Sequence, residues 1–263
     1  MCKLLKMIDA HIHLDQYKDD EMKHIMNSSP LIDRMISVST DLDSCIRNLE
    51  LSRKYQKVKA AFGFHPEQSL ASKEYISELL KWIDQHRGDM IAIGEVGLPY
   101  YLRQQNKVSD VQYEQYHNIL EKFVQSAVVW DKPIVLHAVH EDAPIVCDLL
   151  EKYSIKKAHF HWFKGDQKTI MRMIENGYFI SVTPDIVYKE KIRNIVHMYP
   201  LEQIMIETDG PWPFEGPFTG KMTHPNMMIE TIREISKIKK LSLEEVSDTL
   251  WRNTVSFYEL ENR

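Results

Sequence analysis

Eight short runs of apolar and β-branched residues recur along this chain of 263 residues, and they constrain the fold more than any other feature. Successive runs begin about 21 to 43 residues apart, which leaves room for one helix and two loops in each interval. An alternation of eight strands with helices is typical of a (β/α)8 barrel. The eight expected strands are 7–14, 34–40, 58–64, 90–98, 133–139, 157–163, 178–184 and 204–211.

The intervals between these runs contain apolar residues at helical spacing, within 79–83, 116–127, 145–153, 170–174 and 246–258. Asn176 and Gly177 predict a helix C-cap before the seventh strand. A doubly wound open sheet would give the same alternation, but the chain length is close to that of a barrel. We therefore expect an α/β protein with the (β/α)8 TIM-barrel fold. Since no repeat or flexible linker divides the chain, residues 1–263 are expected to form one domain.

Charge and cysteine content limit the partners and the compartment. The formal net charge of -5 argues against a broad basic face, so no stable nucleic-acid partner is expected, although a local phosphate pocket stays open. Cys2, Cys45 and Cys147 are too few and too scattered for a disulfide framework. No apolar run is long enough to cross a bilayer or to act as a signal segment. We expect a cytoplasmic protein without a membrane partner, and the sequence leaves the oligomeric state open.

Histidines and acids gather toward the carboxyl ends of the expected strands. Those ends converge on one pocket in a barrel, whose interior is otherwise filled by apolar side chains. Several imidazoles and carboxylates there would be costly to bury unless they bind something. Asp9, His11 and His13 alternate at the end of the first strand, so a period of two predicts that all three face the same way. The others are His65, Glu95, His137, His159, His161 and Asp209, from strands three, four, five, six and eight.

This residue set favours a divalent-metal centre. Histidine and carboxylate ligands suit zinc, manganese or related ions, and one carboxylate can bridge two ions. Six candidate ligands are more than one tetrahedral ion needs, which predicts two ions per chain: His11, His13, Glu95, His137, His161 and Asp209. Taken singly, each motif has a structural interpretation, such as a solvated His-x-His pair or a turn at His65. Occurring together at the ends of five strands, they indicate hydrolysis by metal-activated water.

The order and spacing of these motifs resemble the TatD family of metal-dependent hydrolases, a group of amidohydrolase-like barrels. The resemblance covers nearly the whole chain, and Gln112 and Tyr116 resemble the family's glutamine-aromatic helix motif. The matching segments are DAHIHL at 9–14, GFHP at 63–66, GEVGL at 94–98, PIVLH at 133–137, HWFKG at 161–165 and ETDGP at 207–211.

The resemblance implies a role for each ligand. His11, His13, Glu95 and Asp209 would hold one ion, and Glu95 with His137 and His161 would hold the second. The ions would be zinc, manganese or magnesium. Asp209 would also be the catalytic base that takes a proton from the attacking water. Apart from the resemblance, Glu207 points the same way as Asp209 along the strand, so we expect it to orient the ligands.

Three departures make the chain a divergent member of the group. Pro99 stands where the family usually has an acid, and Val139 stands where it usually has an arginine suited to phosphate. The segment 212–218 is also more apolar and aromatic than a phosphate-binding loop needs. The metal ligands are intact, whereas the residues that would contact substrate differ.

Three functions follow as expectations. The first is a deoxyribonuclease-like attack on a phosphodiester, with His65, Lys164 and Trp212 contacting the substrate and with Arg103 or Lys221 as further phosphate contacts. The second is hydrolysis of a small-molecule ester, lactone or amide, which the altered positions 99 and 139 favour. The third is a metal-binding barrel without catalytic activity. The partner in the first two cases is a small-molecule or nucleic-acid substrate.

Overall fold

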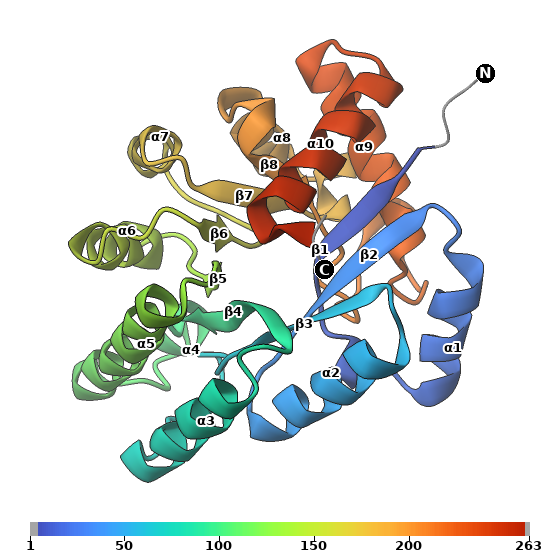
Figure 1. Ribbon diagram of the computed structural model, residues 1–263. Coiled ribbons are helices and arrows are strands. Elements are labelled where there is room, and N and C mark those ends of the chain that lie inside the picture. Colours follow the sequence, from blue (N-terminus) through green and yellow to red (C-terminus); the bar gives the residue numbers. More distant parts are fainter. Residues whose placement is uncertain (1–4, 261–263) are drawn as a thin grey trace.

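The computed structural model describes residues 5–260 and forms a ring of eight parallel strands in the order β1 to β8 (Figure 1). All eight expected strands are present. Seven are shorter than their apolar runs, and β2 has the expected length but begins two residues earlier. The ring closes between the first and last strands through backbone hydrogen bonds from Asp209 to His11 and from His13 to Gly210. The strands are β1 (Met7–Ile12), β2 (Ile32–Val38), β3 (Val58–Phe62), β4 (Met90–Gly97), β5 (Ile134–His137), β6 (Ala158–Phe160), β7 (Phe179–Val182) and β8 (Ile204–Ile206).

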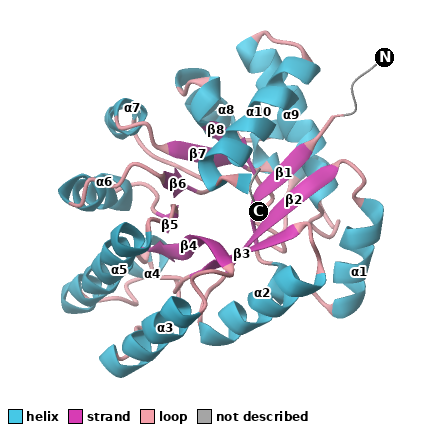
Figure 2. Cartoon of the chain, viewed as in Figure 1, coloured by secondary structure: helices cyan, strands magenta, loops and turns pink. Residues whose placement is uncertain are grey.

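Helices surround the strands, as Figure 2 shows. The five helical patterns named from the sequence fall on α3, α5, α6, α7 and α10. As predicted, α7 is capped by Asn176, and Gly177 follows with a φ of 75°. The helices are α1 (Asp19–Ser28), α2 (Leu42–Lys54), α3 (Lys73–Gln85), α4 (Tyr100–Gln104), α5 (Asp110–Trp130), α6 (Asp142–Lys152), α7 (Gln167–Glu175), α8 (Glu190–Met198), α9 (Met228–Lys239) and α10 (Leu243–Tyr258). The 3-10 turns are η1 (Leu14–Gln16), η2 (Pro184–Val187), η3 (Leu201–Gln203), η4 (Gly216–Phe218) and η5 (Pro225–Met227).

Apolar side chains form two separate clusters. The larger one lies between the strands and the surrounding helices, and pairs such as Phe62 with Trp82 join the two layers. The smaller one fills one end of the barrel interior with strand residues such as Ala10 and Val135, and with Phe257 and Leu260 from the end of α10 and beyond. In Figure 1, α10 runs inward from the upper rim, and its C-terminal end reaches the middle of the ring. The interior is thus closed by α10 at one end, which leaves the carboxyl ends of the strands for a site.

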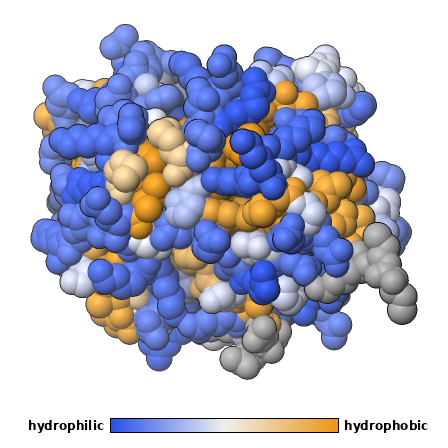
Figure 3. All heavy atoms as spheres, turned by 90° about the horizontal axis from the view of Figure 1, so that it is seen from above, coloured by the Kyte–Doolittle hydropathy of each residue, from blue (hydrophilic) through white to orange (hydrophobic). Residues whose placement is uncertain are grey.

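The outer surface is mostly hydrophilic in the view of Figure 3, with apolar side chains in patches between charged ones. Among residues 5–260, no helix combines the length and the apolar character needed to cross a membrane. Cys45 and Cys147 are buried free thiols, and Cys2 lies outside the described residues.

Candidate metal centre

The six predicted ligands lie together at the carboxyl ends of the strands. His11 is within β1 and His13 directly follows it. Glu95 lies late in β4, and His137 ends β5. His161 and Asp209 follow β6 and β8, and all six side chains are buried. The convergence that the sequence predicts is therefore what the fold produces.

Glu95 lies at the centre of the group, with different histidines at its two oxygens. Oε2 is 3.1 Å from His11 Nε2 and 3.4 Å from His13 Nε2. Oε1 is 3.0 Å from His137 Nδ1 and 2.7 Å from His161 Nε2. One carboxylate thus faces two groups of imidazole nitrogens, one group on each oxygen.

Asp209 completes the first group. Its Oδ1 is 3.3 Å from His11 Nε2 and 3.5 Å from His13 Nε2. Its backbone N–H donates to the carbonyl of His11, and its φ of 50° is in the left-handed region, which aspartate tolerates better than most residues. The chain therefore turns sharply just after β8, and the carboxylate borders both the histidines and the pocket above them.

His65 lies beside the second group. Its Nε2 is 3.3 Å from Glu95 Oε1, and its ring is 4.9 Å from the ring of His137. His65, Glu95 and His137 have ligand atoms close enough to share one ion. The sequence predicts that His65 contacts the substrate. Its position also allows it to bind an ion together with Glu95 and His137.

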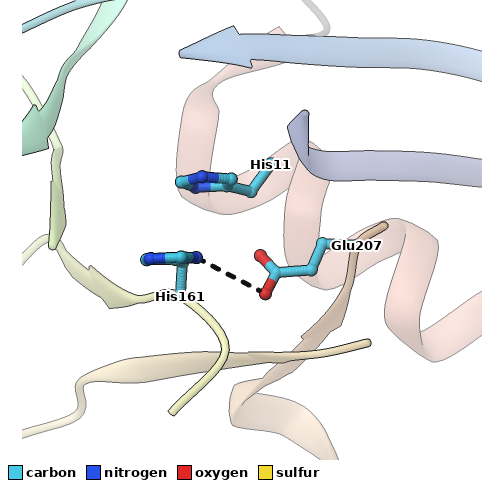
Figure 4. Close-up of side chains that lie close together, drawn as sticks. All are labelled: His11, His161 and Glu207. Carbon is cyan, nitrogen blue, oxygen red and sulfur yellow. Dashed lines mark ion pairs between the residues drawn. The ribbon is translucent and has the colours of Figure 1, made fainter. Parts of the chain in front are cut away.

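Glu207 lies beside the His161 ring (Figure 4), at Nδ1, whereas Glu95 lies at Nε2 of the same ring. Glu207 Oε1 is 3.7 Å from His161 Nδ1, and the rings of His161 and His11 stack with centroids 3.9 Å apart. These three residues form another group that could hold a cation. A carboxylate behind a ligand imidazole fixes the ring and its tautomer, which fits the orienting role expected for Glu207.

Glu67 takes a similar position behind His137, and the sequence analysis missed it. Its Oε1 is 3.4 Å from His137 Nε2, the nitrogen that points away from Glu95. The carboxylate also accepts hydrogen bonds from the backbone N–H groups of Tyr101 and Leu102 at the start of α4. An acid directly after the His65-Pro66 pair was the available signal. Glu67 thus places a carboxylate close to position 99, where the family usually has an acid and this chain has Pro99.

The buried polar atoms of the cluster fit a bound divalent cation. His11 Nε2 and Glu95 Oε2 lie 3.1 Å apart, yet neither atom makes a hydrogen bond of acceptable geometry with any of the described residues. Buried polar atoms are rarely left in this condition. Burial alone would lower the pKa of His11, His13, His137 and His161, but nearby carboxylates outweigh it and raise each to about 9. The carboxylates therefore favour positive charge at this place, and the nitrogen and oxygen donors suit a divalent ion such as zinc or manganese.

Glycines allow the strand that carries Glu95 to approach its neighbours. A Cβ at Gly97 would lie 1.9 Å from the carbonyl oxygen of His137, and a Cβ at Gly63 would lie 2.6 Å from that of Glu95. No side chain fits at either distance. The two glycines thus set the separation between Glu95 and the histidines on the adjacent strands.

Asp9 departs from the expected alternation. The pairing of β1 with β2 has an irregularity between Asp9 and Ile12, so the period of two is interrupted before His11. Asp9 instead accepts hydrogen bonds from the backbone N–H and the hydroxyl of Thr208. Its carboxylate stabilises the turn that carries Asp209.

His159 lies deeper in the barrel than His161. Its Nδ1 is 2.7 Å from the hydroxyl of Tyr258, and its Nε2 is 2.6 Å from Ser181 Oγ, which donates to Glu207. This chain of contacts links the end of α10 to the carboxylate behind His161.

A pocket of about 820 Å³ opens above the cluster. Lys164 and Trp212, both predicted to contact substrate, line it together with Val139. Arg103 and Lys221 are not among the lining residues, and Arg103 instead lies over the ring of Tyr113. The aromatic part of the wall comes from Tyr101, Trp162, Tyr188, Trp212 and Phe214.

Comparison with known proteins agrees with this geometry. Residues 8–259 match the family described as TatD related DNase. An uncharacterized metal-dependent hydrolase of Haemophilus influenzae is 39% identical over 255 residues, covering 97% of this chain and 100% of that protein. Human deoxyribonuclease TATDN3 is 26% identical, covering 96% of this chain and 94% of that protein.

Solved structures show the same fold. The crystal structure of YjjV, a TatD homolog from Escherichia coli, has a TM-score of 0.85 at 24% identity and covers 97% of this chain and 99% of that chain. A hydrolase of the TatD family from Entamoeba histolytica has a TM-score of 0.81 at 20% identity and covers 96% and 98%.

Proposed function

This chain belongs to the TatD related DNase family and is a metal-dependent hydrolase, and on that premise we propose that it cleaves phosphodiester bonds with two divalent ions bound. The position of Glu95 is the observation that carries the proposal. Its Oε2 faces His11 and His13, and Asp209 adds a carboxylate to that pair. Its Oε1 faces His137 and His161, with His65 beside them. His11, His13, Glu95 and Asp209 would hold one ion, and Glu95, His137 and His161 would hold the other.

The bound ions would activate a water molecule and stabilise the negative charge that develops on the group being cleaved. Asp209 is the residue that accepts the proton of the attacking water, because its carboxylate borders both the histidines and the pocket. Glu207 and Glu67 keep the rings of His161 and His137 turned toward Glu95.

A phosphodiester is the first candidate substrate. The human relative is named a deoxyribonuclease, and the pocket wall offers Trp162 and Trp212 as surfaces on which bases can stack. The acidic chain fits a nucleic acid that is a substrate rather than a lasting partner. The location proposed for this reaction is the cytoplasm, in keeping with the buried thiols of Cys45 and Cys147.

A small-molecule ester, lactone or amide is the second candidate. Val139 is buried and lines the pocket where the family usually has an arginine, so one expected phosphate contact is absent. A neutral substrate would not need that contact.

An activity screen with added zinc, manganese or magnesium decides between the two candidates. The panel contains single-stranded DNA, a generic phosphodiester, and sets of esters, lactones and amides. Turnover of the phosphodiesters alone supports the proposal, and turnover of esters, lactones or amides alone supports the second candidate. The Asp209→Asn variant is the control, since activity from a contaminating enzyme would survive in it.

A further inference from the structure

One lysine in the pocket has a cationic head without an acidic partner. Lys164 is half-buried in the loop between β6 and α7, and its Nζ donates to the hydroxyl of Tyr101 at 3.1 Å. The same Nζ is 4.0 Å from the centroid of the Trp162 ring. Within residues 5–260, no carboxylate lies at ion-pair distance from it. The ammonium is thus held by aromatic groups and a hydroxyl, and an anion is the partner that it lacks.

Lys164 lies next to the position where the family's arginine is missing. The backbone N–H of His140 donates to the carbonyl of Lys164 at 2.5 Å, which joins the loop after β5 to the loop after β6. Val139 precedes His140 and lines the same pocket as Lys164. The side chain of Lys164, from the loop after β6, therefore lines the same pocket that an arginine at position 139 would line.

Trp162, against which Lys164 packs, is fixed in an unfavourable backbone conformation. Its φ is 37°, in the left-handed region that bulky residues rarely adopt. Two acids hold it there. Glu207 accepts its backbone N–H at 2.6 Å, and Asp185 accepts its indole N–H at 2.8 Å. Strain of this kind persists where surrounding contacts impose it, and it is concentrated at ligand-binding sites.

The nearest charged neighbours of Lys164 are Lys189 and Asp185, which form an ion pair with each other. Lys189 pairs with Asp185 at 3.0 Å, whereas Lys164 has no such pair. Burial, together with the neighbouring charge of Lys189, lowers the pKa of Lys164 to about 8, and Asp185, Asp209 and Glu207 offset this only in part. At neutral pH the side chain is still mostly charged, so it offers an incompletely solvated positive charge to a ligand.

We propose that Lys164, supported by Trp162 and Tyr101, binds the phosphate group of the substrate in place of the arginine that is absent at position 139. The inference rests on the proposed phosphodiester reaction and names the contact that selects an anionic substrate. Lysine binds phosphate as a point charge, without the two-pronged geometry of arginine.

The test measures the affinity of the metal-loaded protein for inorganic phosphate by calorimetry. Lys164→Met keeps the length of the side chain and removes its charge, and it should weaken phosphate binding by about tenfold or more, as expected for loss of a charge-assisted contact. Lys221→Met is the matched control, because Lys221 is exposed, donates to the carbonyl of Pro217 and does not line the pocket. Its phosphate affinity should equal that of the wild type. Metal content and thermal unfolding are measured for each variant.

Restoring the arginine provides a second arm. Adding Val139→Arg to Lys164→Met should recover part of the lost phosphate affinity, because the new guanidinium enters the same pocket. Lys164→Met that binds phosphate as tightly as the wild type would overturn the inference, as would a wild type without measurable phosphate binding.

The outcome is separable from that of the proposed reaction. A protein that binds phosphate through Lys164 but turns over only neutral esters keeps the anion site and contradicts the reaction. A protein that cleaves phosphodiesters with the same KM after Lys164→Met keeps the reaction and contradicts the anion site.

Discussion

Replacing Asp209 by asparagine tests the chemistry most directly. Asparagine keeps the size of the side chain and one oxygen, and it also tolerates the left-handed φ of 50° at this position. The remaining oxygen can stay near His11 Nε2, which lies 3.3 Å from Oδ1 in the wild type. The fold and the second ion, bound by Glu95, His137 and His161, should therefore persist.

The loss should appear in turnover. Burial would raise the pKa of Asp209, but the imidazoles of His11 and His13 beside it outweigh burial and lower the pKa well below the ordinary value, so the carboxylate is ionised at neutral pH and can accept a proton. Removing a general base costs about 10²–10⁴-fold in rate. At about 1.36 kcal/mol for each factor of ten, the barrier should rise by about 2.7–5.4 kcal/mol.

The assay compares kcat for Asp209→Asn and His11→Ala at increasing metal concentration, with metal content and thermal unfolding measured in parallel. Added metal should restore part of the activity of His11→Ala, because a weakened site can be refilled. It should not restore Asp209→Asn, because metal cannot replace a base. Near wild-type turnover of Asp209→Asn at saturating metal would refute the assignment.

Four further predictions follow from the geometry. Elemental analysis of reloaded wild type should find more than one ion per chain, and Glu95→Ala should hold one or fewer; an unchanged ratio would contradict the bridging role. Glu67→Gln should weaken binding of the second ion by about 10–100-fold, because His137 loses the carboxylate that orients it, and a metal titration that matches the wild type would exclude this role. Gly97→Ala should destabilise the protein by about 1–3 kcal/mol in a denaturant titration, since its Cβ would lie 1.9 Å from a carbonyl oxygen; equal stability would mean that β4 can shift freely. Binding of a phosphodiester anion should weaken as pH rises through about 8, because Lys164 loses its proton there, and the Lys164→Arg variant should lack this dependence.

The sequence predicted the barrel and the placement of the ligand side chains because both depend on local patterns. Strand runs and the histidines at their ends are contiguous in the chain, and parallel strands bring their carboxyl ends together. The regular alternation at Asp9 was wrong, since it assumes an unbroken strand and β1 has an irregularity after Asp9.

Contacts between loops could not be predicted. Glu67 follows β3, yet it lies behind His137 from β5 and accepts hydrogen bonds at the start of α4. Lys164 was named as a substrate contact, but its closeness to Val139 depends on a hydrogen bond between two loops. Such pairings involve residues far apart in the chain, and no periodicity connects them.

The closure of the barrel interior by α10 bears on how the protein is made. The last metal ligand, Asp209, leaves the ribosome before Phe257 and Tyr258, which pack beneath the strands and contact His159. At about 5–20 residues per second, the intervening stretch of about 50 residues takes roughly 2 to 10 seconds to synthesise. During that interval all six metal-ligand residues have been synthesised, but the residues of α10 that close one end of the barrel interior have not. The contacts that run from Tyr258 through His159 and Ser181 to Glu207 therefore form only after the end of α10 has been synthesised.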